Sequence, residues 1–115
     1  MDELQDNLLK RKSLAISLAQ TLMLKGRTTL ARMKYKEASQ IELALVNKYP
    51  ESRFIHLLSA FWSSFHAQEI ELAKKCLIKL NEMINSIMPL NDVQLEEIRK
   101  CVRGFKELKE KLKNA

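Results

Sequence analysis

The sequence predicts an all-α protein, and three observations lead to that prediction. Only two glycines and two prolines occur among the 115 residues, too few for the many turns of a β-sandwich or barrel. The composition is dominated by residues that favour helices, above all Leu, Ala, Glu and Lys. Apolar residues also recur at spacings of three and four along most of the chain. A chain of this length is expected to form a single domain, residues 1–115.

Two helices are expected before Pro50. Residues 2–34 carry an apolar stripe at helical spacing, and Asp2 and Glu3 suit the positive end of a helix dipole. The stripe is interrupted by the basic run 10–12, so this segment is either one helix or two that meet near Ser13. Residues 35–49 form the next helix, which Pro50 ends because proline cannot continue it.

Three further helices are expected at about 53–67, 69–86 and 92–112. Ser52 and Asn91 or Asp92 are suitable N-caps, and Pro89 marks the boundary before the last helix. The third helix is the most apolar, with large side chains over an arc of about 160°. Its opposite side is small or polar: His56, Ser59, Ala60, Ser63, Ser64 and His66.

A spacing of 35 residues relates the second expected helix to the fourth. The pairs that share this spacing are 35/70, 38/73, 41/76 and 45/80, and each segment follows another apolar helix. The unit is therefore a helical hairpin that occurs at least twice. The alternative is an ordinary helical bundle in which this spacing is accidental.

This pattern resembles the tetratricopeptide repeat. Tyr35, Ala38, Leu45 and Pro50 follow the spacing of the family's second helix, and the glycine of its first helix falls at Gly26. Leu45 stands where the family usually has Ala. The resemblance implies antiparallel hairpins at about 14–49 and 53–86, stacked as an α–α superhelix, with a capping C-terminal helix at about 92–113.

The sequence contains no recognisable catalytic, cofactor-binding or metal-binding motif. Cys76 and Cys101 lie in apolar helical patterns and are expected to be buried free thiols, typical of a reducing cytosol. His56 and His66 are expected to be solvated or locally hydrogen-bonded rather than metal ligands. Neither a carboxylate pair nor a phosphate-binding glycine loop is present, so we expect a protein that is not an enzyme.

The resemblance to tetratricopeptide proteins implies a concave groove lined by the first helices of the hairpins. The family's groove positions fall on Gln20 and Ala31 in the first hairpin and on His66 in the second, together with the seven residues that we take as the binding site. Trp62 is the expected anchor, because large aromatics contribute most when fully desolvated. The alternative is that Trp62 packs against the last helix. The seven site residues are Met23, Arg27, Leu30, Ile55, Leu58, Trp62 and Phe65.

The length, the repeat and the apolar groove are also similar to the small chaperones that hold the needle subunit of bacterial type III secretion. That resemblance implies a cytoplasmic protein that holds an amphipathic helix of a self-assembling subunit, beside a second small co-chaperone. The acidic N-terminus lacks the charge pattern of a signal peptide, and the apolar runs are too short to cross a membrane, so no membrane insertion is expected.

Two other functions stay open. A small basic helical protein could bind nucleic acid, because the net charge is +6, although acidic residues are mixed with the basic ones. The last helix could form a homodimeric contact through Leu95, Ile98, Val102 and Phe105, although Lys109 interrupts that stripe. The basic residues of the possible nucleic-acid patch are Lys10, Arg11, Lys12, Lys25, Arg27, Arg32, Lys34 and Lys36.

Overall fold

The computed structural model describes residues 2–86 and 89–114, and these residues form an all-helical protein without strands. The prediction of the fold class is thereby confirmed. The five α-helices are α1 (Glu3–Leu24), α2 (Thr28–Lys48), α3 (Arg53–His66), α4 (Ile70–Ile84) and α5 (Asp92–Lys113), with a 3-10 turn at Pro50–Ser52.

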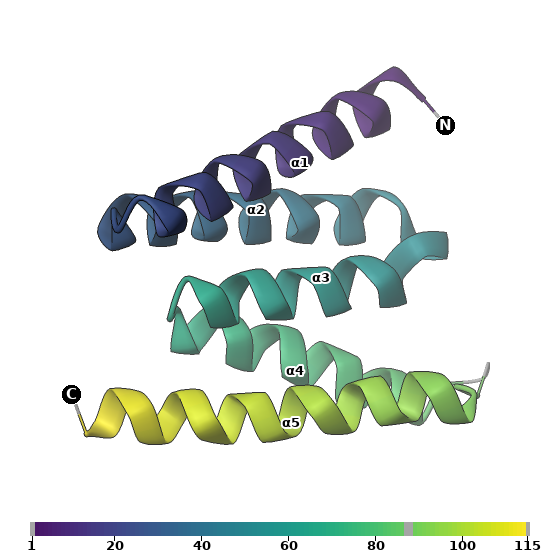
Figure 1. The fold of residues 1–115 in the computed structure, drawn as a ribbon. Helices are drawn as coiled ribbons and strands as arrows, with labels where there is room; N and C mark the ends of the chain where they lie inside the picture. Colours follow the sequence, from purple (N-terminus) through teal and green to yellow (C-terminus); the bar gives the residue numbers. More distant parts are fainter. Residues whose placement is uncertain (1, 87–88, 115) are drawn as a thin grey trace.

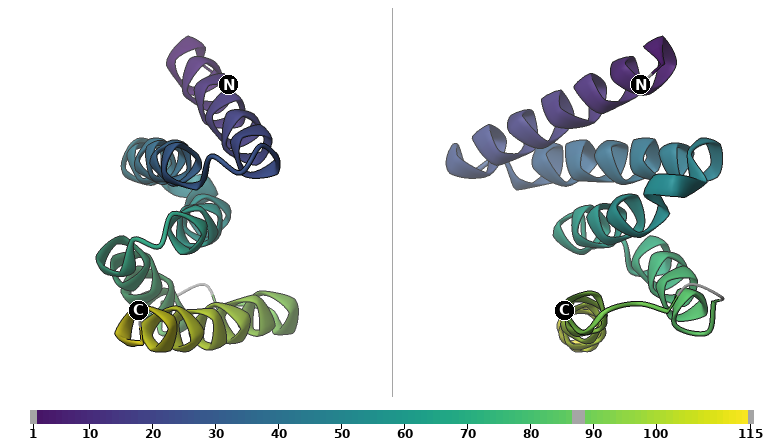
Figure 2. Two further views of the ribbon diagram at one scale, coloured as in Figure 1. Left: turned by 60° about the vertical axis from the view of Figure 1, so that its left-hand side comes forward. Right: turned by 90° about the vertical axis from the view of Figure 1, so that its right-hand side faces the viewer.

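The helices stack in chain order, from α1 at one end of the molecule to α5 at the other (Figure 1). The helices also alternate across the stack. In the left view of Figure 2, α1 and α3 lie on one flank and α2 and α4 on the other. Each helix packs mainly on its neighbour in sequence, and α5 contacts both α3 and α4. The arrangement is therefore two antiparallel hairpins, α1–α2 and α3–α4, closed at the end by α5.

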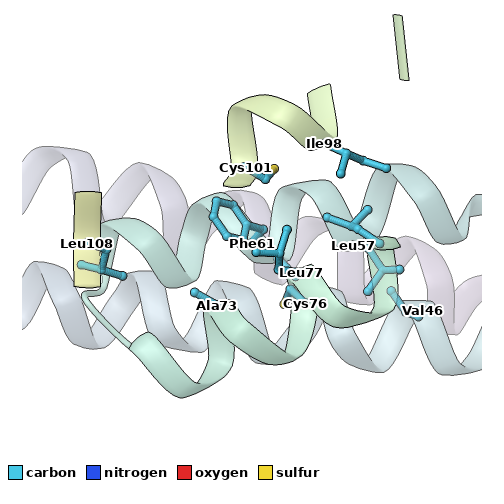
Figure 3. Close-up of a cluster of buried hydrophobic side chains, with 11 residues drawn as sticks. Val46, Leu57, Phe61, Ala73, Cys76, Leu77, Ile98, Cys101 and Leu108 are labelled. Carbon is cyan, nitrogen blue, oxygen red and sulfur yellow. The ribbon is translucent and has the colours of Figure 1, made fainter. Parts of the chain in front are cut away.

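The main hydrophobic core lies between α3, α4 and α5 (Figure 3). Phe61 and Leu57 of α3 are fully buried there against Leu80 of α4 and Ile98 of α5. A smaller cluster joins Leu8 of α1 to Ile41 and Leu45 of α2. Helix α1 thus packs only in the smaller cluster, while Val46 of α2 joins the larger core of the other three helices.

The turn between α1 and α2 corrects the expected helix boundary. The chain turns at residues 25–27, rather than near Ser13 or Tyr35, and Gly26 follows α1 instead of lying within a helix. Gly26 has a φ of +74°, a left-handed conformation that glycine adopts at little cost. The N–H of Arg27 donates to Leu22 O and that of Gly26 to Met23 O, the hydrogen bonds of a Schellman turn. The first hairpin therefore spans residues 3–48, and α2 has two turns before Tyr35.

The second hairpin turns in the same way, although it has no glycine. Gln68 has a φ of +58°, its N–H donates to Phe65 O, and the N–H of Glu69 donates to Ser64 O. This is again a Schellman turn, with Gln68 in the position that Gly26 holds in the first hairpin. The sequence predicted the boundary between these two helices but not the conformation of the turn, because glutamine is not a residue that signals a left-handed conformation.

Two of the residue pairs that share the 35-residue spacing are buried to the same extent. Ala38 and Ala73 are fully buried, and so are Leu45 and Leu80. The two Schellman turns are further apart than this spacing, since α2 begins two helical turns before Tyr35 whereas α4 begins at Ile70. The repeat therefore relates the later part of α2 to α4, not the whole hairpins.

The remaining boundaries agree closely with the sequence. Ser52 precedes α3 but its side chain makes no capping hydrogen bond, because the 3-10 turn at Pro50 leads directly into the helix. Asn91 begins α5 with a capping box, in which its side chain accepts from the N–H of Gln94 and its own N–H donates to the Gln94 side chain.

Most of the polar side of α3 is buried against α2, and His56 is hydrogen-bonded there rather than solvated. His56 is buried, and its Nδ1 lies 2.6 Å from Oε2 of Glu42, a fully buried residue of α2. Ser64 is also buried, with its Oγ 2.6 Å from that of Ser39 in α2. Because α2 covers this side of α3 and α4 and α5 cover the apolar side, α3 is packed on both faces.

Cys76 and Cys101 are free and buried, as expected from the sequence. Burial raises the pKa of Cys76 to about 11 and that of Cys101 to about 12. The thiolate is the nucleophile, so both residues should be unreactive in the folded protein at pH 8.

We expect a disulfide reagent to label neither thiol until denaturant unfolds the chain, and then to label both. Since the thiols stay protonated in the folded state but ionise near pH 9 in the unfolded state, stability should fall as the pH rises above about 9. Rapid labelling of the native protein would contradict the buried placement of the thiols.

Candidate binding groove

An apolar hollow of about 430 Å³ lies between α1 and α3. Ile16 and Gln20 of α1 form one wall, and Tyr35 of α2 lies among the lining residues. The other wall is a row of α3 side chains at helical spacing: Ile55, Leu58, Ser59, Trp62, Ser63 and His66.

The geometry of this hollow follows from the helix order. Because α2 pairs with α1 on one side and with α3 on the other, α1 and α3 come to lie on the same side of the stack (Figure 2). The flanks of α1 and α3 that do not pack on α2 then face each other across a gap. Ile55 is 68% exposed and Leu58 is partly exposed, so this apolar surface remains accessible.

Trp62 both lines the hollow and packs on α5. Its ring meets Phe61 and Phe65 edge-to-face, with centroids 5.0 and 5.3 Å apart. A Cβ added at Gly104 of α5 would lie 3.1 Å from the indole ring, so the absence of a side chain there allows the close approach. Helix α5 therefore holds one edge of the indole in place and leaves the ring available along the hollow.

A second hollow of about 520 Å³ continues past His66, which lines both. Met23, Arg32 and Phe65 contribute to it from the first three helices. Glu107, Leu108 and Lys111 of α5 close its far side. Helix α5 thus frames this part of the groove rather than filling it. We refer to the two hollows together as the groove.

The groove brings together five of the seven residues taken from the sequence. Ile55, Leu58 and Trp62 line the first hollow, and Met23 and Phe65 line the second. Arg27 and Leu30 lie apart, around a shallow depression at the α1–α2 turn, because the turn at Gly26 moves them out of α1. Ala31, another groove position of the family, is fully buried and cannot contact a partner.

The sequence reasoning missed Ile16 and Tyr35, which also line the first hollow. Ile16 could have been found, because Ile16, Gln20 and Met23 follow one another at spacings of four and three on one flank of α1. Tyr35 could not, because the sequence predicts that a helix begins there, whereas Tyr35 lies within α2.

The charge around the first hollow is low. The side chains of Gln20, Ser59 and Ser63 are uncharged, and burial lowers the pKa of His66, which favours its neutral form at pH 7. The ring of His66 lies 5.1 Å from that of Tyr35 and 5.5 Å from that of Phe65. A ligand in this hollow would therefore meet an apolar and aromatic surface with neutral polar groups.

Half of the basic residues considered for nucleic acid are engaged in ion pairs. Each ammonium lies within 3.2 Å of a carboxylate oxygen, which lowers the charge available to a phosphate backbone. The pairs are Lys10 with Asp6, Lys12 with Glu42, Lys34 with Glu37 and Lys36 with Glu69.

Within residues 2–86 and 89–114, no cluster of three His, Cys, Asp or Glu side chains is placed to hold a metal ion. No helix in this part of the chain combines the length and apolar character needed to cross a bilayer. Comparison of the chain with models of known protein families, with curated proteins and with solved structures finds no match.

Proposed function

We propose that this protein is a non-enzymatic binding module that holds an amphipathic helix of a partner protein in its groove. The observation that carries the proposal is the row Ile55, Leu58 and Trp62, which follows one flank of α3 and stays accessible. An amphipathic helix presents apolar side chains at the same spacing and could lay them along this row.

Within this function we propose the role of a holding chaperone. A self-assembling helical subunit would stay soluble if its apolar face were covered, and a preformed groove achieves this without a nucleotide or a catalytic step. The tetratricopeptide-like packing, the likeness to needle-subunit chaperones, a second small co-chaperone and a bacterial cytoplasmic location all belong to this proposal. The two free, buried thiols are consistent with a reducing compartment.

The test uses an exposed residue of the groove, so that loss of binding is not loss of folding. Ile55→Glu places a charge in the first hollow, whereas Ile78→Glu places one on α4, outside the groove. The two residues are 68% and 49% exposed, so neither substitution should unfold the protein. Co-purification from the native host, followed by titration of the captured protein, should give an affinity about tenfold or more weaker for Ile55→Glu.

Ile78→Glu should bind the captured protein as the wild type does, and circular dichroism should be unchanged for both variants. A partner that Ile55→Glu retains would contradict binding in the groove. If nucleic acid alone is captured and elutes as the salt concentration rises, the basic surface would be the binding site instead.

A further inference from the structure

The second hollow of the groove combines apolar side chains with two cations. Met23 and Phe65 line it beside Arg32 of α2 and Lys111 of α5. One carboxylate, that of Glu107, also faces it, so cationic groups outnumber anionic ones. Burial favours the neutral form of His66, which lies where the two hollows meet.

Neither cation has an ion-pair partner in the described part of the chain. The eight salt bridges between described residues include neither Arg32 nor Lys111, although Glu107 precedes Lys111 by one helical turn. Lys36, one turn beyond Arg32 on α2, shows the contrast, because its ammonium lies 2.8 Å from Oε1 of Glu69. Arg32 is also only partly exposed, so part of its side chain is held against the protein.

The two hollows give the groove an uncharged end and a cationic end. A ligand lying along α3 would meet an uncharged apolar surface from Ile55 to Trp62 and then the two cations beyond His66. An apolar ligand alone would bury Arg32 without a partner, and such desolvation costs free energy. A carboxylate at that point would form charge-assisted hydrogen bonds with the guanidinium instead.

We propose that the groove selects an amphipathic helix of another protein that carries Asp or Glu side chains at one end, facing Arg32 and Lys111. This inference rests on the proposed function, because it requires that a helix occupies the groove. It adds the chemistry of the partner: an apolar stripe about three helical turns long, the span from Ile55 to His66, followed directly by a carboxylate-bearing turn.

Two synthetic helical peptides of equal length test the inference by fluorescence anisotropy. Both carry the same apolar stripe at spacings of three and four; one ends in a turn rich in Glu and the other in the same turn with Gln. At low salt, the Glu peptide should bind the wild-type protein about three- to tenfold more tightly. This preference should shrink as the salt concentration rises.

Arg32→Gln should remove most of the preference for the Glu peptide over the Gln peptide. Arg11→Gln is the matched control, because Arg11 is an exposed cation that lines neither hollow. The Arg11→Gln variant should keep the preference for the Glu peptide. Equal affinities for the two peptides, or an equal effect of both arginine substitutions, would overturn the inference.

Ile55→Glu separates this inference from the proposed function. If both peptides bind equally and Ile55→Glu abolishes both, the groove holds a helix and the charge preference is wrong. If neither peptide binds, the proposed function and the inference both fail. If a single-stranded oligonucleotide binds more tightly than the Glu peptide and loses affinity with Arg32→Gln, the two cations serve phosphate contacts and the inference is overturned.

Discussion

Replacing Phe61 with alanine is expected to lower the free energy of unfolding by about 3–5 kcal/mol. Phe61 is fully buried at the centre of the core shared by α3, α4 and α5 (Figure 3). Its ring also supports that of Trp62, edge-to-face at 5.0 Å, and lies 3.7 Å from the Cβ position of Gly104. Truncation would therefore leave a cavity where three helices meet. Urea unfolding followed by circular dichroism measures the loss.

Ile55→Ala is the matched control for this prediction. It removes a large apolar side chain from the same helix, but one that is 68% exposed, so the free energy of unfolding should change by less than about 0.5 kcal/mol. A small effect of Phe61→Ala, comparable to that of the control, would mean that α5 does not close over α3 as the structure shows.

Replacing Glu42 with alanine is expected to cost about 3–5 kcal/mol, because it breaks a buried charge cluster. The Glu42 carboxylate accepts from Lys12 Nζ of α1 at 3.1 Å, and from Ser59 Oγ of α3 at 3.0 Å. Nδ1 of His56 lies 2.6 Å from the other oxygen and donates to it, since a carboxylate can only accept. Removing Glu42 leaves these donors without their acceptor, and His56 cannot reach solvent.

A combined variant, Lys12→Met with Glu42→Leu and His56→Leu, distinguishes pairing from packing. Apolar residues of similar size need no partner, so the triple variant should regain most of the stability that Glu42→Ala loses. Both are measured by urea unfolding at pH 7. If the triple variant is as unstable as Glu42→Ala, the loss of stability does not come from the unpaired donors alone. If Glu42→Ala costs less than about 1 kcal/mol, the cluster is not buried in solution.

The sequence predicted the helices from α3 onward because proline and the Asn91 cap mark their ends. It failed at the α1–α2 turn, where a glycine resembling the family's intrahelical glycine instead adopts a positive φ. The basic run at 10–12 also looked like an interruption of α1. In the structure, Lys12, the last residue of this run, forms an ion pair with the buried Glu42, and α1 continues through the run without a break.

The sequence did not predict that the polar side of α3 is buried. A helical wheel separates one apolar face from one polar face, and it assigns the apolar face to the interior. Helix α3 is covered on both faces, so Ser64 and His56 are buried against α2 while Ile55 is exposed. Single-helix periodicity cannot show this, because the outcome depends on which helices lie on either side.

The separate apolar cluster of the N-terminal hairpin has a consequence for how the groove behaves. Helix α1 contributes no residue to the main core, and its apolar packing is with α2. It can therefore detach locally at a lower free energy than global unfolding requires. Because α1 carries Ile16 and Gln20, one wall of the groove is held through α2 alone, whereas the α3 wall is part of the main core. The two walls of the groove are thus anchored differently, and we expect the α1 wall to adjust more readily than the α3 wall to the bulk of the helix that enters.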